Sequence, residues 1–575
     1  RLPGSGVYPA EDPLPAPELD PRAFWRKAAA EWATTLARVR PGDYVEQLWK
    51  KYLEEVPDGC IREARPPDDI PRGKRCVTRR FGKDEGLKPD GSQKIRPIDD
   101  YTASWVNAAT APTDRLVLQT LDDALVAARA LETALQHPVQ IWKADHKGAY
   151  RQVPVRTEHL PAMYISIFQP AADGGAPQLR VAQHTAMPFG AVGALHGYQR
   201  LSEALTHIGI YLGGLLIMHY VDDFWVLDAA PCAWSGFRTF HSLMRLLGFQ
   251  LEPKKTTRPA AEVELLGMHL RLSTQVGGPY QVAGPAERRT KLLQQLRTLR
   301  DTNTLSPGEA GKLAGRLGFA AGALFGRVGR AYLRPLYDRQ HASPEARDAE
   351  GWLLDAALRN ALHWWTVLLE HGPPRAAAAP IAGPDQQQYP VLYTDPSEED
   401  PADGGKWLGA VLFLPTGEVR ALACRPNRHF YNALPPRQKH IVALELVAAL
   451  VAYETWQHHL AGVPFHLYID NDAANRALVT GFSSRGDLAR MAGAWWLHMA
   501  TDGSTPWVWR VPSTVNPADW PTRPADGWTL LRRLAPNYEK DTVHVDWARL
   551  TRTVSAAELP PAAVTLGKRA APAGA

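Results

Sequence analysis

The segment of residues 215–227 places two adjacent carboxylates between two runs of strand-forming residues. Asp222 and Asp223 follow a run rich in Leu, Ile and aromatic residues, and a second such run comes directly after them. This pattern predicts a β-hairpin with the two aspartates at its tip. Two like charges beside buried strands are costly unless a cation such as Mg²⁺ neutralises them. An isolated Asp-Asp pair, however, is more often a turn with two solvated acids.

The residues around this pair decide between the two interpretations. Tyr220-Val221-Asp222-Asp223 resembles the tyrosine-x-Asp-Asp box of reverse transcriptases, and other pieces of that family's pattern occur in order between residues 60 and 530. The resemblance implies an RNA-directed DNA polymerase with two Mg²⁺ ions per active site, or Mn²⁺ in their place. It therefore favours a metal site over a solvated turn.

A further carboxylate ends a predicted strand earlier in the chain. Residues 139–145 have the composition of a strand that ends on Asp145, 77 residues before Asp222. An Asp in this place can meet another Asp on a neighbouring strand, but it can also cap a helix. Two metals about 4 Å apart need carboxylates from two segments. Asp145 matches the family's first catalytic motif, so the resemblance makes Asp145 and Asp222 bridging ligands and Asp223 a third.

The resemblance also implies contacts to the incoming nucleotide. Tyr150 corresponds to the aromatic residue beneath the sugar, although an aromatic residue after a strand can also pack in a core. Phe189 and Gly190 lie in a glycine-rich turn that is similar to the motif packing against nucleotide and template, or that simply reverses the chain. The basic residues with an implied role are Lys94 and Arg96, which would grip the triphosphate, and Lys254 or Lys255, which would neutralise or protonate the departing pyrophosphate.

Basic charge is concentrated in two stretches. The 575 residues carry a formal net charge of only +5, yet residues 72–96 hold nine Lys or Arg against three acids, and residues 287–334 hold ten against three. The first stretch is punctuated by Gly and Pro, which predicts strands and loops that contact phosphates or form a solvated face. The second has helical spacing and resembles the thumb, whose helix tracks a primer–template through phosphate contacts.

Local patterns predict the remaining elements of the first part of the chain. These are one or two helices between 21 and 53, a strand-like run at 151–155, helices at 194–205, 237–247 and 352–369, and a strand at 263–270. The four cysteines have no paired spacing, which fits a reducing compartment. No apolar run approaches the ~20 residues that cross a bilayer.

Four carboxylates recur after a Pro- and Ala-rich joint at 373–380. Asp395 and Asp470 end predicted strands, Glu445 lies in an apolar helix and Asp519 lies at a helix start. Each alone can be a cap, turn or surface residue, but an acid in an apolar helix needs a partner. In this order they resemble ribonuclease H, which implies a second two-metal site that hydrolyses phosphodiesters. Asp472 is expected at the surface, and no His stands just before Asp519, where several ribonucleases H have one.

These observations predict an α+β right-hand polymerase with fingers, palm and thumb, followed by an α/β ribonuclease H-like domain. The predicted divisions are a partly disordered lead-in at 1–59, fingers and palm at 60–280, a helical thumb or connection at 281–370, a linker at 371–388, the ribonuclease H-like domain at 389–535 and a tail at 536–575, disordered from 551.

The residues around Asp519 look most like those of DIRS-type or other long-terminal-repeat-related retroelements. The resemblance implies an RNA template, a DNA primer, RNA–DNA hybrid and deoxynucleoside triphosphates as partners, no membrane, and a place in the cytoplasm or nucleus. The alternative is a decayed element that only binds nucleic acid. The seven retained carboxylates speak against it, because drift would be expected to remove some of them.

Overall fold

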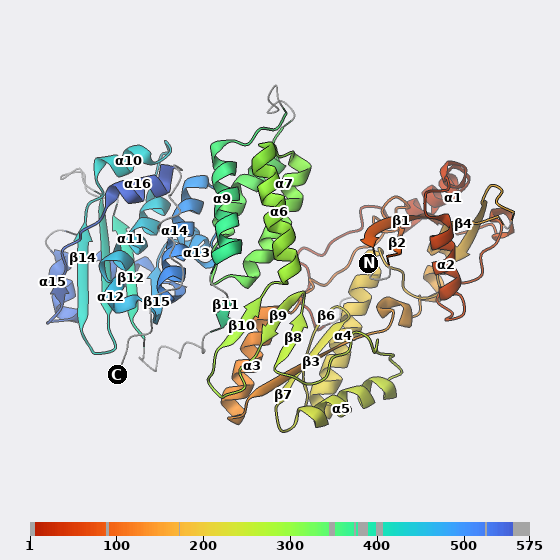
Figure 1. The fold of residues 1–575 in the computed structure, drawn as a ribbon, viewed down its shortest axis with the longest axis horizontal. Coiled ribbons are helices and arrows are strands. Elements are labelled where there is room, and N and C mark those ends of the chain that lie inside the picture. Colours follow the sequence, from red (N-terminus) through yellow and green to blue (C-terminus); the bar gives the residue numbers. More distant parts are fainter. Residues whose placement is uncertain are drawn as a thin grey trace. The chain divides into compact units, whose positions relative to one another are not determined.

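A computed structural model describes residues 6–87, 91–171, 173–343, 351–372, 375–377, 389–397, 406–523 and 526–555. The chain forms two compact units, of which one comprises Arg1–Leu266 and Leu272–Gly278, and the other Gly267–Arg271 and Pro279–Ala575. Figure 1 shows their helices and strands, coloured along the sequence. Across the described ranges, no helix is long and apolar enough to cross a membrane.

The predicted lead-in contains two helices, which confirms the one or two helices expected between residues 21 and 53. Helix α1 (Pro21–Arg38) starts at Asp20, whose side chain accepts hydrogen bonds from the first backbone N–H groups, and α2 is Val45–Glu55. Ahead of them Tyr8 is buried. Its hydroxyl donates to Glu203 Oε2 (3.2 Å) and accepts from Gln199 Nε2 (3.0 Å). These bonds attach the segment to a helix that lies almost 200 residues away in sequence.

A four-stranded sheet carries the first basic stretch. Its strands are β1 (Val77–Leu87), β2 (Gln93–Asp99), β4 (Tyr164–Gln169) and β5 (Gln178–Gln183), in the order β2-β1-β4-β5. The β1–β2 and β4–β5 pairs are antiparallel, and β1 and β4 are parallel. The prediction of strands and loops for residues 72–96 is therefore confirmed.

A three-stranded sheet, in the order β3-β7-β6, carries the Asp-Asp pair. Its elements are α3 (Leu121–Leu135), β3 (Val139–Asp145), α4 (Val192–Gly213), β6 (Leu216–Tyr220), β7 (Asp223–Ala229) and α5 (Ala233–Leu246). Trp142, Phe224 and Phe240 are fully buried where α4 and α5 cover one face of this sheet (Figure 1). The predicted hairpin and the helices beside it are confirmed.

Two strands predicted before residue 280 differ in the structure. Residues 151–155 form no strand, because the chain turns through the 3-10 helices η2 (Ala149–Gln152) and η3 (Thr157–Ala162). The predicted strand at 263–270 is divided into β8 (Glu262–Leu265) and β9 (Met268–Arg271). Leu266 and Gly267 between them have φ values of 48° and 75°, which an extended strand does not allow.

The second unit begins with helices that follow a short strand. In chain order the elements are β10 (Tyr280–Ala283), α6 (Ala286–Thr302), α7 (Pro307–Ala320), η4 (Ala321–Ala323), η5 (Arg330–Leu333), α8 (Arg334–Gln340), α9 (Ala356–His371) and β11 (Arg375–Ala377). Strand β11 pairs with β10, so the predicted linker at 371–388 is wrong where it includes these residues. Residues 378–388 of that linker lie outside the described residues.

A six-stranded sheet, in the order β16-β15-β12-β13-β14-β17, forms the centre of this unit. Its strands are β12 (Val391–Ser397), β13 (Trp407–Phe413), β14 (Val419–Cys424), β15 (Pro464–Ile469), β16 (Thr505–Arg510) and β17 (Glu539–Lys540). The accompanying helices are α10 (Arg428–Ala433), α11 (Ile441–Thr455), α12 (Gln457–Leu460), α13 (Asp472–Thr480), α14 (Gly486–Asp502), η7 (Ser513–Val515), η8 (Pro517–Asp519), α15 (Asp526–Leu534) and α16 (Trp547–Ser555). The predicted hairpin of Val391–Asp395 with Gly409–Phe413 is confirmed.

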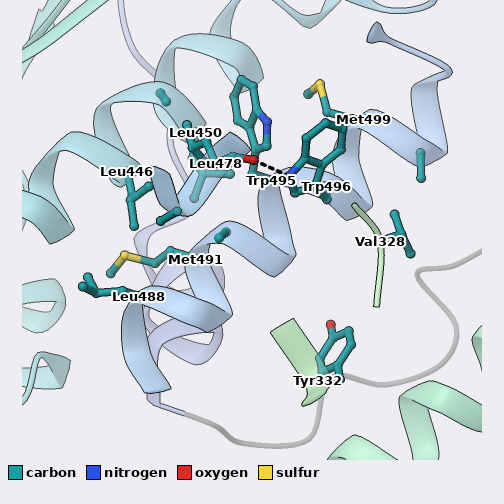
Figure 2. Packing of buried hydrophobic residues seen from close by; sticks show 14 of the residues in the cluster. Val328, Tyr332, Leu446, Leu450, Leu478, Leu488, Met491, Trp495, Trp496 and Met499 are labelled. Carbon is teal, nitrogen blue, oxygen red and sulfur yellow. Dashed lines mark hydrogen bonds between the residues drawn. The ribbon is translucent and has the colours of Figure 1, made fainter. Parts of the chain in front are cut away.

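One hydrophobic core joins the helices on both sides of the predicted linker. Val328 and Tyr332 belong to the same buried cluster as Trp495 and Trp496 of α14, as Figure 2 shows. The indole of Trp496 donates to the carbonyl of Leu478 at 2.8 Å, which fixes the ring. Leu550 of α16 is also part of this core. The predicted tail is therefore wrong up to residue 555, and residues 556–575 lie outside the described part.

Candidate active sites

The β3-β7-β6 sheet brings the first three carboxylates together. Asp223 opens β7 and lies directly opposite Asp145 on β3 and Tyr220 on β6. Val221 and Asp222 form the hairpin turn, and Val221 has a φ of 58°. A β-branched residue in this left-handed region is strained, which costs of order 1–3 kcal/mol. The hairpin is thus held in a shape that its sequence alone would disfavour.

A hydrogen bond from helix α4 supports the turn. Ser202 Oγ donates to the carbonyl of Val221 at 2.7 Å, and Ser202 is fully buried. This bond fixes the peptide just before Asp222. The neighbouring helix therefore determines where the first carboxylate of the pair lies.

The three carboxylates crowd one another. Burial, together with the charges of Asp145 and Asp223, raises the pKa of Asp222 to about 6. Burial and the charge of Asp145 also raise the pKa of Asp223. Asp145 Oδ2 accepts a hydrogen bond from Lys255 Nζ at 2.6 Å, so one ammonium group offsets part of this charge. The site is short of positive charge relative to its three acids.

The donor set at this site suits a hard divalent cation, because it consists of carboxylate oxygens only. In the part of the chain that the structure describes, no group of three or more His, Cys, Asp and Glu side chains surrounds a common metal position. The pairing of Asp145 with Asp223, and the position of Asp222 in the adjoining turn, nevertheless bring the three acids into one cluster. A cation among them would lower the pKa values that burial and like charge have raised.

Tyr150 and Phe189 lie together beside this cluster. The ring of Tyr150 is 4.9 Å from that of Phe189 and 5.0 Å from that of Tyr198. Burial and the charge of Asp222 raise the pKa of Tyr150 to about 12. Gly190 has a φ of 91°, and a Cβ there would lie 2.9 Å from the carbonyl oxygen of Asp99. A side chain at position 190 would therefore be excluded on both counts.

The basic residues predicted to contact the triphosphate and pyrophosphate have the following partners. Lys94 Nζ and Arg96 Nε, both on β2, pair with Glu85 at 2.9 and 2.8 Å, and both side chains are exposed. Lys254 contributes a backbone N–H to Glu252 Oε1, at 3.3 Å. Of the two adjacent lysines, the structure brings Lys255 and not Lys254 to the carboxylates.

The six-stranded sheet brings together the four later carboxylates. Strands β12 and β15 are parallel, and Tyr393 on β12 lies opposite Tyr468 on β15. Two residues further along each strand direction come Asp395 and Asp470, so these two acids are neighbours at the same end of the sheet. Glu445 is buried in α11, where Asp470 and Asp395 both act to raise its pKa. Helix α11 packs against β12 and β13, which carries Glu445 to the sheet.

Residues around η8 complete this second cluster. Asn516 Nδ2 donates to Asp395 Oδ1 at 3.3 Å and to the carbonyl of Thr394 at 3.1 Å. Asp519 ends η8 and pairs with Arg523 at 2.7 Å. Asp472 instead pairs with Arg510 and is largely exposed, as predicted. Asp519 is thus in a short 3-10 turn rather than at the start of an α-helix.

Burial and like charge both raise the pKa values of the second cluster. Burial and the charges of Asp470 and Asp519 raise the pKa of Asp395 to about 8. Burial and the interactions with Asp470 and Asp395 raise the pKa of Glu445 to about 11. Glu445 Oε2 is buried and has no hydrogen-bond partner among the described residues. A divalent cation fits this donor set, since it would satisfy the orphan oxygen and relieve the like-charge repulsion.

Three solved structures of a foamy viral protease-reverse transcriptase are similar to this chain. One, with double-stranded DNA, has a TM-score of 0.42 and 14% identity, and covers 89% of this chain and 74% of that chain. Another, with an RNA/DNA hybrid, has a TM-score of 0.42 and 13% identity, and the match covers 83% of this chain and 55% of that chain. The third, also with double-stranded DNA, has a TM-score of 0.42 and 13% identity, and the match covers 88% of this chain and 99% of that chain. No protein-family model and no curated protein matches the chain.

Sequence reasoning missed several residues that shape these sites. Ser202 and Asn516 are polar residues whose contacts come from distant segments. Asn516 was visible in the sequence as part of the same motif as Asp519, but nothing local indicated its bond to Asp395. A larger omission is the buried ionic cluster of the four-stranded sheet, formed by Glu55, Arg80, Asp99, Arg151 and His184.

Proposed function

We propose that this chain is an RNA-directed DNA polymerase with a second site that hydrolyses the RNA of an RNA–DNA hybrid. The observation that carries the first activity is the direct pairing of Asp145 with Asp223 across β3 and β7, with Asp222 in the strained turn next to them. Three acids from two segments, held by a sheet and by Ser202, form a rigid anionic site.

Asp145, Asp222 and Asp223 would hold Mg²⁺ in the polymerase site. The bound ions would neutralise phosphate charge and lower the pKa of the primer hydroxyl. Lys255, which now contacts Asp145, carries a positive charge that a triphosphate could also use. Tyr150 and Phe189 offer aromatic surface to the sugar and base of a deoxynucleotide.

The second activity rests on the orphan oxygen of Glu445 within the four-carboxylate cluster. Asp395, Glu445, Asp470 and Asp519 would hold Mg²⁺ there, which would activate water for attack on a phosphodiester. Asn516 orients Asp395, and Arg523 balances the charge of Asp519.

The proposed substrates are an RNA template, a DNA primer, deoxynucleoside triphosphates and RNA–DNA hybrid. The basic faces of β1, β2, α6 and α7 support phosphate binding, because Arg and Lys supply charge-assisted donors. We further propose an origin in a retroelement of DIRS-like or other long-terminal-repeat-related type, on the motif around Asp519.

Primer extension tests the polymerase proposal. Purified protein is given oligo(dT) on poly(rA), dTTP and Mg²⁺, and Asp222→Asn is the matched variant. We expect extension by the wild type and none by Asp222→Asn, with primer–template binding almost unchanged, because the neutral amide relieves charge crowding and keeps the shape. Equal synthesis by the variant, or no synthesis by a wild type that binds the duplex, would overturn the assignment.

Cleavage of labelled RNA in an RNA–DNA hybrid tests the second site. Asp395→Asn should end cleavage and leave extension intact, since the two carboxylate clusters belong to different compact units. Undiminished cleavage by this variant would show that the four-carboxylate cluster is not the site of hydrolysis.

A further inference from the structure

An aromatic row crosses one face of the six-stranded sheet. We define it as Tyr393 on β12, Tyr468 on β15, and Trp507 and Trp509 on β16. Tyr393 is paired with Tyr468, and Tyr468 with Trp509, so the three rings stand side by side on adjacent strands. The rings of each pair are nearly parallel, at 14° and 16°, with centroids 4.7 and 6.4 Å apart. Trp507 adds a fourth ring 5.8 Å from Trp509.

The row lies at the open end of its sheet face. Alternate residues of the same strands, Leu392, Leu467 and Val508, point the other way into the helical core. On the face of the row, α15 covers β13 and β14 through Leu531. Strand β16 is the edge strand, and Trp507 and Trp509 there are 51% and 39% exposed. Two large aromatic side chains are thus presented to solvent.

The rings are held in place before any ligand arrives. Trp509 Nε1 donates to His466 Nδ1 at 2.9 Å, and His466 is buried. The stack with Tyr468 fixes the plane of the same indole. A preorganised stack of rings loses little side-chain entropy on binding. The exposed rings at the edge of this stack, Trp507 and Trp509, are also of the kind on which unpaired nucleobases stack.

The row runs into the proposed hydrolytic site. Asp395 follows Tyr393 by two residues and Asp470 follows Tyr468 by two, so along each strand an acid comes after a ring on the same side. A single strand lying on the rings would therefore lead directly to or from the four carboxylates. Double-stranded nucleic acid offers no free base faces to such a surface.

We propose that the aromatic row binds single-stranded RNA through base stacking, with Trp507 and Trp509 as the main contacts. The proposal gives the hydrolytic site a substrate-guiding surface, and in that respect it rests on the proposed function. The binding itself needs only the exposed rings. It is therefore measurable without cleavage.

Fluorescence anisotropy with a labelled oligo(rU), in EDTA, tests the binding. Trp507→Ala should weaken binding at least five-fold, because one base–aromatic stack contributes that much or more. Trp507→Phe should restore most of it. Trp234→Ala is the matched control, since Trp234 of α5 is 47% exposed but belongs to the other compact unit, and it should have no effect. Binding of fully double-stranded RNA–DNA should not respond to any of these changes.

Photo-crosslinking locates the contact directly. A 5-bromouridine oligomer should crosslink to the peptide that contains Trp507 and Trp509. Unchanged affinity of Trp507→Ala, or crosslinks only to other peptides, would overturn the proposal. A change in sedimentation of Trp507→Ala without any change in oligo(rU) affinity would overturn it too, in favour of an interface with a second copy. If stacking is confirmed while wild type cleaves no hybrid, only the hydrolytic proposal fails.

Discussion

Lys255 Nζ donates to Asp145 Oδ2 at 2.6 Å, across 110 residues of sequence. Asp145 is buried and lies opposite Asp223. The pKa of Asp223 is raised by burial and by the charge of Asp145. Lys255 thus offsets part of the negative charge of the cluster by direct contact, and the charge of Lys143 also lowers the pKa of Asp223. The adjacent Lys254 makes no described side-chain contact with the cluster.

The two lysines should therefore differ in their effect. We expect Lys255→Met to slow primer extension at least ten-fold and Lys254→Met to change it less than two-fold. Without Mg²⁺, Lys255→Met should also unfold at a lower temperature than the wild type, because three acids then face one another unpaired. Addition of Mg²⁺ should narrow that difference. Steady-state extension rates measure the effect on synthesis, and thermal unfolding with and without Mg²⁺ measures the effect on stability. Equal rates and equal unfolding temperatures for the two variants would contradict the expectation.

Tyr150 is expected to select deoxynucleotides. A 2′-hydroxyl against its ring costs about 1–3 kcal/mol by overpacking, which is roughly ten- to a hundred-fold in discrimination. Tyr150→Val should gain ribonucleotide incorporation and keep deoxynucleotide use. Because the ring also packs on Phe189 and Tyr198, a purely structural role predicts equal loss of both. Single-nucleotide insertion with dTTP and UTP separates the two outcomes.

Glu445→Gln should remove the response of the second cluster to Mg²⁺. Mg²⁺ at a hundred times its Kd would stabilise the wild type by about 2.7 kcal/mol, and the variant should lose most of that gain. Hybrid cleavage should be lost and primer extension retained. Asp472→Asn, a nearby exposed carboxylate paired with Arg510, is the control and should behave as wild type. An undiminished Mg²⁺ response in Glu445→Gln would remove Glu445 from the site.

His184 makes stability depend on pH. Burial lowers the pKa of His184 to about 4, so the ring is neutral at pH 7. Its Nε2–H group donates to Asp99 Oδ2 at 2.9 Å, and its Nδ1 atom accepts from Arg151 at 2.8 Å. The unfolded chain, with a His pKa of about 6.5, binds this proton more readily than the folded one. The contribution of His184 to stability should therefore fall by up to about 3 kcal/mol as the pH drops from 6.5 to 4. Comparison with a His184 variant separates it from the carboxyl groups whose raised pKa values act in the opposite direction.

Urea unfolding between pH 4 and 7 measures this loss. His184→Gln, whose amide can donate and accept in the same directions, should flatten the pH dependence. His137→Gln changes an exposed histidine between α3 and β3 and should leave the dependence as it is in the wild type. A slope that persists in His184→Gln would assign the effect to another group.

Local patterns were sufficient for much of the fold. The runs on either side of Asp222 and Asp223 predicted a hairpin because alternation and strand composition are local properties. The strand that ends on Asp145, the strand that carries Asp395 and continues to Ser397, and the apolar helix around Glu445 were predictable for the same reason. Failures came where the backbone turns without a break in apolar composition, as at Leu266, or where a low-complexity run pairs as a strand, as in β11.

The sequence by itself determined which carboxylates exist and on what kind of element each lies. Only the tertiary structure decided that Asp145 faces Asp223, that Lys255 rather than Lys254 reaches them, and that Glu445 meets Asp470. It also decided that Tyr393, Tyr468 and Trp509 form one row, because strands far apart in sequence become neighbours in the sheet. The physical reason is that register and helix packing are set by the burial of whole faces, which is a property of the folded chain and not of any short segment.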